Sequence, residues 1–440
     1  MRRLLLGAAT GMLLTFNGGI ARADPVTITL ARFFGACEAD YGTSTDVSKA
    51  RGECGIITTL VNKFNAENKG QIVVQPQIVE WDPYYEQMTA RIVSHDVPTI
   101  AVMHMSQLGD FVQRKLVLPM DDVMKDAGID PSDMTVAATN GVTIGGHVYA
   151  LPWDTHSWLW HYNVGLMKQA GLVGADGNPK IPSSIDELVQ QAATFKQKTG
   201  KTFMEFTSGT DVAGPARTFY TLVAQQGGKL FPDDPKHAVF GPQEKTAMGA
   251  FTTLSHDGAF TPNTDYNSAT SAFLNGDAGL YINGTWLIDS FTESAAKPGS
   301  ALSSGYYVTA FPTLMGKPAV WADGHSWVLF KGGMTDANKP AVEKFVKFMW
   351  DNNGEWARTG HLPIRKSVLE SAAFQALPFR KNIMVIAQTA TILPHDVRRQ
   401  FGLQTIIGEE YDNAISGAKT VDVAADAAQS RIDDLLAKVH

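Results

Sequence analysis

The sequence predicts an α/β protein, because segments with the pattern of buried strands alternate with segments that carry apolar residues at helical spacing. Residues 26–34 alternate and are rich in β-branched side chains, as expected of a strand. Residues 54–68 place apolar side chains at helical spacing, and Gly70 then ends the helix. Further strands are expected at 72–80 and 98–105. The chain has 440 residues, 44% of them hydrophobic and 18% charged, which is enough for two domains.

The stretch 273–286, FLNGDAGLYINGTW, has the clearest series of local signals. A helix is expected to end at Asn275-Gly276, because glycine adopts the left-handed helix-stop conformation without a steric penalty. Residues 279–282 form a short apolar run that suits a buried strand. In a doubly wound sheet, the turn from a strand into the next helix opens toward the ligand crevice. Trp286 follows such a turn, so we expect it either at the mouth of the crevice or in the core.

The N-terminus has the features of a secretory signal peptide. The positive pair Arg2-Arg3 precedes an apolar stretch too short to cross a bilayer, and an Ala-Arg-Ala cleavage site ends at Ala23. We expect residues 1–23 to be removed and the mature protein to begin at Asp24 in a bacterial periplasm. No later stretch is long and apolar enough to predict a membrane span.

The charge balance argues against two classes of partner. Lys and Arg number 37 and Asp and Glu number 44, which gives a net charge of −7 with no basic block. Nucleic acids and anionic membrane surfaces bind to clustered basic residues, so neither is expected as a partner.

The chain contains two cysteines, Cys37 and Cys54. In an oxidising compartment, a pair this close in sequence favours a disulfide. Two free buried thiols are the alternative. A metal site is less favoured, because no His or Cys pair of matching spacing lies nearby.

Several blocks of the chain resemble the extracellular solute-binding proteins of ABC importers, family 1, the maltose- and trehalose-binding type. These blocks are 146–163 (GHVYALPWDTHSWLWHYN), 273–286, 321–327 (WADGHSW) and 359–368 (TGHLPIRKSV). The resemblance implies a two-lobed periplasmic-binding-protein fold of type II, with a ligand cleft between the lobes and three interlobe crossings. It places the N-terminal lobe at 24–152 and 311–352, and the C-terminal lobe at 153–310 and 353–440.

The chemistry of saccharides guides the choice of site residues. Sugar rings lay their apolar C–H faces on aromatic rings, and their hydroxyls exchange hydrogen bonds with planar polar side chains, most strongly with charged ones. The resemblance implies that Trp153, Asp154 and His156 face the cleft and that Trp286 stacks on sugar. The full set of expected ligand-binding residues is Asp40, Tyr41, Trp81, His104, Ser106, Gln107, Trp153, Asp154, His156, Trp286, Asp323, Gly324, His325 and Arg365.

The resemblance implies a periplasmic binding protein that closes on its solute by a hinge and delivers it to the membrane subunits of an ABC permease. An α-linked disaccharide is the first expectation. A polyol, or an anionic glycerol or sugar derivative, is the alternative, and His104, His156, Arg32 and Arg365 leave room for an anionic ligand. We expect a monomer without a cofactor or a metal ion.

A secreted glycoside hydrolase is the alternative from another class. Two carboxylates suffice for that reaction, and Asp154 and Asp323 could serve. The sequence has neither the H-E-x-x-H nor the G-x-S-x-G motif of other hydrolases. Solute capture requires only ground-state binding, so no catalytic residue is expected.

Overall fold

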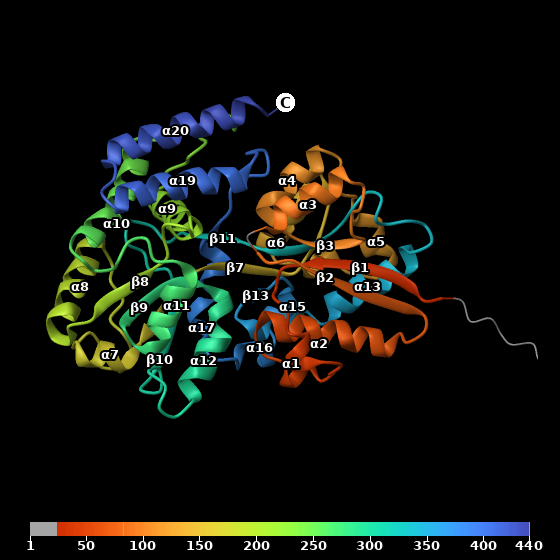
Figure 1. Cartoon of the computed structure of the whole chain (residues 1–440), viewed down its shortest axis with the longest axis horizontal. Coiled ribbons are helices and arrows are strands. Elements are labelled where there is room, and N and C mark those ends of the chain that lie inside the picture. Colours follow the sequence, from red (N-terminus) through yellow and green to blue (C-terminus); the bar gives the residue numbers. More distant parts are fainter. Residues whose placement is uncertain (1–23, 82, 440) are drawn as a thin grey trace, which may run out of the picture.

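The computed structural model describes residues 24–81 and 83–439. The chain forms two α/β bodies that lie side by side, each built around its own sheet (Figure 1). The predicted signal peptide, residues 1–23, lies outside the described residues. Within the described ranges, no helix has the length and apolar character needed to cross a membrane.

The first sheet is mixed and contains five strands. Their order is β2 (Ile72–Ile78), β1 (Val26–Arg32), β3 (Ile100–His104), β12 (His325–Leu329) and β6 (Leu151–Pro152). β1 is parallel to β2 and β3, whereas β12 is antiparallel to β3 and β6. Every residue of β3 and β12 is buried, as expected for central strands covered on both faces.

The second sheet is organised around the ten-residue strand β7 (Asp154–Asn163), which is buried along its whole length. Its strand order is β14 (Ala390–Thr391), β11 (Val320–Asp323), β7, β9 (Ala278–Gly284) and β8 (Thr202–Phe206). β10 (Tyr306–Ala310) and β13 (Leu362–Pro363) also pair with β7. A short hairpin, β4 (Thr143–Ile144) and β5 (His147–Val148), stands apart from both sheets.

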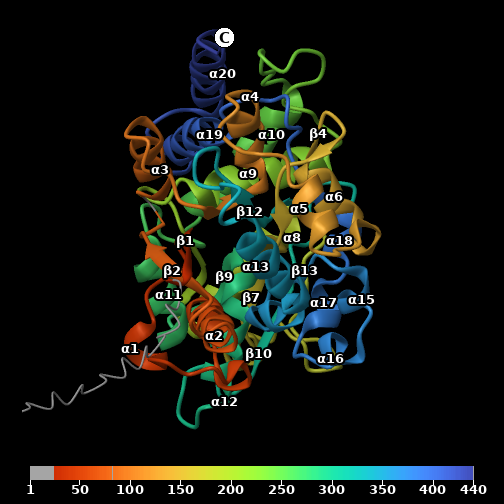
Figure 2. The same ribbon diagram turned by 90° about the vertical axis from the view of Figure 1, so that its right-hand side faces the viewer.

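Helices surround each sheet (Figures 1 and 2). Those of the first body are α1 (Glu38–Tyr41), η1 (Val47–Lys49), α2 (Gly52–Glu67), α3 (Tyr84–Val93), α4 (Met105–Gln113), α5 (Asp121–Asp126), η2 (Pro131–Asp133), α6 (Val136–Val142), α13 (Lys339–Asp351) and α14 (Asn353–Trp356). Those of the second body are α7 (Val164–Gln169), α8 (Ile185–Thr199), α9 (Ala213–Gln225), α10 (Pro242–His256), α11 (Tyr266–Asn275), η3 (Thr285–Leu287), α12 (Ile288–Ala296), α16 (Ala372–Gln375), α17 (Arg380–Ile383), α18 (Ile386–Thr389), α19 (Gln400–Ile415) and α20 (Val421–Ala437). η4 (Ala357–Thr359) and α15 (Lys366–Leu369) flank β13 between the two bodies.

Two separate hydrophobic cores underlie the two bodies, which we call the N-terminal and C-terminal lobes. Trp153, Trp356 and Ile364 belong to the core of the N-terminal lobe. Phe311 and Val320 belong to the core of the C-terminal lobe. We propose lobe boundaries that differ by several residues, at each crossing, from those that the sequence predicts. The shift assigns each of these side chains to the lobe whose core it packs in.

The local predictions for 273–286 are confirmed. Helix α11 ends at Asn275, and Gly276 follows in the left-handed conformation with φ 77°. The expected strand is β9, whose Gly279 lies so close to the Phe195 ring that a Cβ would stand 2.4 Å from it. The strand then leads through η3 into α12. Small residues at these positions therefore let the strand and its neighbours approach closely.

The predicted disulfide between Cys37 and Cys54 is present, with 5.8 Å between the two Cα atoms. It joins the loop after β1 to the first turn of α2. Because the bridge closes a short loop, it restricts the unfolded chain and stabilises the fold.

We expect the double substitution Cys37→Ser/Cys54→Ser to lower the free energy of unfolding by roughly 3 kcal/mol, the chain-entropy value for a loop of this size. Denaturant titration of both proteins measures the difference. Wild-type protein treated with a reductant serves as the control and should match the double variant. Equal stability of oxidised and reduced wild type would contradict the prediction.

A second prediction concerns Glu205 on β8, which is buried. Burial, together with the nearby charge of Asp277, raises the pKa of Glu205 from 4.5 to about 7. Between these pH values the folded state holds a proton that the unfolded state has lost, so the free energy of unfolding should fall as pH rises through this range. Glu205→Gln should remove this fall, which is up to about 3 kcal/mol.

Denaturant titrations at several pH values test the Glu205 prediction. The variant should be more stable than wild type above the raised pKa and similar to it below the ordinary pKa. Glu67→Gln, a change at an exposed position on α2, should keep the wild-type pH dependence. An unchanged slope in Glu205→Gln would show that this carboxyl group is not the cause.

Candidate functional site

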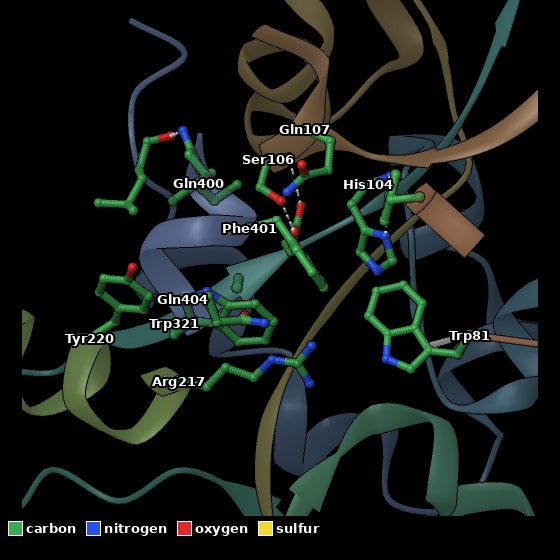
Figure 3. A pocket seen from close by; sticks show the side chains of 15 residues that line it. Trp81, His104, Ser106, Gln107, Arg217, Tyr220, Trp321, Gln400, Phe401 and Gln404 are labelled. Atoms are coloured by element: carbon green, nitrogen blue, oxygen red, sulfur yellow. Dashed lines mark hydrogen bonds between the residues drawn. The ribbon is translucent and has the colours of Figure 1, made fainter. Parts of the chain in front are cut away.

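A pocket lies between the two lobes and takes side chains from both of them (Figure 3). The N-terminal lobe contributes Trp81, Tyr85, His104, Ser106 and Gln107. The C-terminal lobe contributes Arg217 and Tyr220 from α9, Trp321, Ala322 and Asp323 from β11, Ile392, Leu393, and Gln400, Phe401 and Gln404 from α19. The pocket is therefore complete only while the lobes are together.

Five of the predicted site residues line this pocket. They are Trp81, His104, Ser106, Gln107 and Asp323. β3 ends at His104 and α4 begins at the next residue, so Ser106 and Gln107 lie in the first helical turn. This is the strand-to-helix position at which an α/β lobe presents polar groups to a ligand.

Asp323 joins the two lobes at the pocket wall. Its carboxylate accepts hydrogen bonds from the Ser106 hydroxyl at 2.5 Å and the Ser106 backbone N–H at 3.1 Å. The backbone N–H of Gly324 also donates to it at 2.8 Å. Burial raises the pKa of Asp323, and these donors oppose that shift.

Behind His104 lies a buried cluster around the carboxylate of Asp154. His156 Nδ1 donates to Asp154 Oδ1 at 3.1 Å, and His325 Nδ1 donates to Oδ2 at 2.7 Å. The backbone N–H of His325 and the indole N–H of Trp356 donate to the same carboxylate, at 3.1 and 2.7 Å. Asp154 thus has four donors from three different parts of the chain.

The cluster shifts the pKa values of its members in opposite directions. Burial would raise the pKa of Asp154, but the charges of His325 and His361 and its hydrogen bonds hold the pKa well below its usual range. Burial lowers the pKa of His156 to about 3. Burial also acts to lower the pKa of His361, but Asp154 and Glu53 outweigh it and raise that pKa.

The sequence analysis did not predict Arg217, which has the most distinctive chemistry of the missed pocket residues. Its guanidinium group is buried and lies 4.5 Å from the Trp321 ring centre and 5.6 Å from that of Trp286. Among the described residues no side chain or carbonyl hydrogen-bonds to it, and its Nε is buried without a partner. Figure 3 shows the guanidinium directed toward the space between Trp321 and Trp81.

Nine further lining residues were missed. Five come from α19 and the segment before it, namely Ile392, Leu393, Gln400, Phe401 and Gln404, and the other four are Tyr85 from α3, Tyr220 from α9, and Trp321 and Ala322 from β11. Phe401 lies 5.8 Å from the Tyr85 ring and 6.3 Å from the Trp81 ring, so it closes the pocket from the opposite lobe. No local motif marks the five residues from α19 and the segment before it, whereas Trp321 and Ala322 stand in the block 321–327. Arg217 had one usable signal, since it is the only charged residue of 213–225.

Other predicted residues lie near the pocket without lining it. Trp286 is half-buried, donates its indole N–H to the Tyr266 hydroxyl at 3.0 Å and touches the Arg217 side chain. Gly324 joins β11 to β12 where a Cβ would stand 2.4 Å from the backbone oxygen of Asp154. Its role is therefore to let two crossing segments approach each other.

The structure places four predicted residues away from the pocket. Trp153 is fully buried in the N-terminal core against Trp327 and Trp356. Arg365 pairs with Asp133 at 2.7 Å and lies over the ring of Trp350.

The other two residues in this group, Asp40 and Tyr41, belong to α1. The Tyr41 ring covers Gly55, and its hydroxyl accepts a hydrogen bond from the backbone N–H of Arg51 at 3.0 Å. α1 therefore packs on its own lobe, whereas Gly52, later in the disulfide loop, hydrogen-bonds Asp289 of the other lobe.

The lobes are closed on the pocket in this conformation. The cavity volume is about 30 Å³, far below the roughly 300–1,000 Å³ of small-molecule sites. Contacts between lobes flank it: Arg398 pairs with Asp110 at 2.7 Å, and the Gly52 backbone N–H donates to Asp289 at 2.8 Å. At the upper end of the molecule, α19 lies beside α4 (Figures 1 and 2). A ligand of disaccharide size therefore requires the lobes to separate.

Comparisons with known proteins place the fold and the family. A family model described as bacterial extracellular solute-binding protein matches residues 59–382. The sn-glycerol-3-phosphate-binding periplasmic protein UgpB of Pectobacterium atrosepticum is 23% identical, with 96% of this chain and 98% of that protein covered. The GacH receptor of Streptomyces glaucescens, whose structures include an acarbose complex, has a TM-score of 0.77 at 20% identity, covering 94% of this chain and 100% of that chain.

Maltose-bound MalE3 of T. maritima has a TM-score of 0.76 at 17% identity, covering 93% of this chain and 100% of that chain. These likenesses support a two-lobed periplasmic sugar-binding fold, as the sequence motifs predict. Since the family model spans most of the chain, the protein belongs to the bacterial extracellular solute-binding proteins.

Proposed function

We propose that this protein is the periplasmic solute-binding component of an ABC importer and that it captures a saccharide in the pocket between its lobes. The observation that carries the proposal is the composition of that pocket, in which aromatic rings and planar polar groups from both lobes meet. A signal peptide cleaved after Ala23 would deliver the protein to the periplasm, where the closed form would dock on the permease.

The pocket has the groups that recognise a sugar. Trp81, Trp321 and Phe401 offer ring faces for the apolar sides of a pyranose. Gln107, Gln404 and Asp323 offer amide and carboxylate groups for its hydroxyls. A site that hydrogen-bonds specific hydroxyls rejects analogues that lack them, because its own buried polar groups would be left unpaired. An α-linked disaccharide is the first ligand class to test.

Capture by lobe closure explains why the pocket is lined from both lobes. A ligand that contacts both lobes binds the closed form more tightly than the open form, so it shifts the population toward closure. The family and its relatives are binding proteins, which argues against the glycoside hydrolase alternative. The geometry also opposes it, because the Asp154 carboxylate is buried under four donors and has no free oxygen to act as an acid or nucleophile.

Arg217 favours a second candidate ligand, an anionic glycerol or sugar derivative. A buried guanidinium group without a hydrogen-bond acceptor is costly, and an anionic oxygen of the ligand would satisfy it with strong charge-assisted bonds. UgpB of Pectobacterium atrosepticum, which is 23% identical and covers 96% of this chain, is named for binding sn-glycerol 3-phosphate. A neutral saccharide would instead have to satisfy Arg217 with its hydroxyls.

We expect one ligand class to raise the thermal unfolding midpoint in a screen of disaccharides, monosaccharides, polyols and glycerol phosphates. A ligand at about 100 times its Kd adds about 2.7 kcal/mol to the free energy of unfolding. The bound ligand should be recovered chemically intact. Recovery of a cleaved sugar would contradict a purely binding role, and no response to any member would contradict the ligand classes proposed here.

Arg217→Met tests whether Arg217 binds the ligand. For an anionic ligand, loss of the charge-assisted bonds should cost about 1.5–3 kcal/mol, or roughly 10- to 150-fold in Kd by isothermal titration calorimetry. Arg114→Met, a change at an exposed position at the end of α4, is the matched control and should bind like wild type. Unchanged Kd in Arg217→Met would remove Arg217 from the site.

A further inference from the structure

Four histidines from separate segments gather at the inner wall of the pocket. His104 ends β3, His156 is on β7, His325 begins β12, and His361 precedes β13. The ring centres of His104, His156 and His325 lie 4.5–5.5 Å from one another. All four side chains are buried, with at most 6% of any of these residues exposed. A saccharide site does not need such a cluster, so it calls for its own explanation.

In all four imidazoles Nδ1 is held by an oxygen of another side chain. The Tyr85 hydroxyl lies 2.8 Å from Nδ1 of His104. The two carboxylate oxygens of Asp154 hold Nδ1 of His156 and of His325. Within the described part of the chain no hydrogen bond engages Nε2 of His104, His156 or His325. One ring nitrogen of each of these three lies within 4.8 Å of a ring nitrogen of each of the other two.

This arrangement matches the way proteins build transition-metal sites. A ligating histidine has its other ring nitrogen fixed by a carboxylate, carbonyl or other oxygen, which sets the tautomer and the direction of the metal-binding nitrogen. We propose that His104, His156 and His325 form a binding site for a divalent transition-metal ion of the zinc class, ligated through their Nε2 atoms.

The same region contains two other candidate donor sets, and both are weaker. Glu53, His325 and His361 form one, and Asp154, His156 and His361 form the other. His361 has Nδ1 bonded to Thr285 at 2.9 Å and Nε2 bonded to Glu53 at 2.8 Å, so neither nitrogen is free. The Asp154 oxygens are already occupied by donors. The triad of His104, His156 and His325 is the one set with uncommitted nitrogens.

The spacing suits a small ion after minor adjustment. Zinc lies about 2.0–2.1 Å from histidine nitrogens in tetrahedral sites, so ligand nitrogens stand roughly 3.4 Å apart. Small rotations of three imidazoles would bring nitrogens within 4.8 Å to that separation. Three protein ligands leave a fourth position for water or for an oxygen of the solute. His104 lines the pocket, so that position would be close to a bound ligand.

The carboxylate of Asp154 holds Nδ1 of both His156 and His325, so a negatively charged group lies directly behind two of the three proposed ligands. The inference stands independently of the proposed function, because metal binding to the ligand-free protein does not require the solute to be known.

Equilibrium dialysis against Zn²⁺, with metal analysis of protein prepared without a polyhistidine tag, tests the proposal. Wild type should bind one ion per chain. His104→Gln, His156→Gln and His325→Gln should each weaken binding by at least about 10-fold, the effect of losing even an outer contact. His256→Gln changes an exposed histidine on α10 and should bind like wild type. Equal Zn²⁺ binding by wild type and all three variants would overturn the proposal, as would no ion in wild type.

Two further measurements test the site even where the histidine variants fail to fold. Tyr85→Phe keeps all three imidazoles and removes only the oxygen that holds His104, so we expect it to weaken Zn²⁺ binding by about 10-fold. Wild type titrated with Co²⁺ should show the intense visible absorption of a low-coordinate site, and His156→Gln should lose it. A Co²⁺ spectrum typical of hydrated metal in wild type would also overturn the site.

Discussion

The hinge region depends on the hydrogen bonds that the carboxylate of Asp154 accepts. Asp154 stands at the start of β7, pairs across the strands with Pro363, and accepts hydrogen bonds from His156, His325 and Trp356. These partners lie on the three segments that cross between the lobes. A buried carboxylate is stable only while its donors remain in place, and removing one partner of such a charge typically costs about 3–5 kcal/mol. The three crossings are therefore held together at one point while the lobes beyond them can rotate.

This constraint determines where a ligand can be held. The pocket wall begins where the crossings end, at His104 on one side and Asp323 on the other, and Ser106 links the two lobes through Asp323. Farther out, Phe401 and the pair formed by Arg398 and Asp110 close the opening. In a rotation of the lobes about these crossings, residues near the crossings move less than residues at the opening. A polar inner wall can thus stay preformed while the outer contacts are made only around a ligand.

Sequence alone predicted the parts of this protein that depend on local interactions. The strand and helix around Gly276, the helix after Cys54 and the family motifs all reflect local conformational preference or short-range spacing. The sequence did not predict the positions of side chains that depend on packing between distant segments. Trp153 stands in a motif beside Asp154, yet its side chain turns into the N-terminal core. Phe401 lies more than three hundred residues from Trp81 and contacts it only because α19 folds across the cleft. No pattern in the sequence predicts that α19 packs across the cleft.

The central claim is that solute capture closes the two lobes around the pocket. Small-angle X-ray scattering of the protein, without ligand and then saturated with the ligand that gives the largest thermal stabilisation, tests it most directly. The account predicts a larger radius of gyration without ligand than the value calculated from this closed structure, and a decrease to that value on saturation. Identical scattering curves with and without a saturating ligand would contradict it.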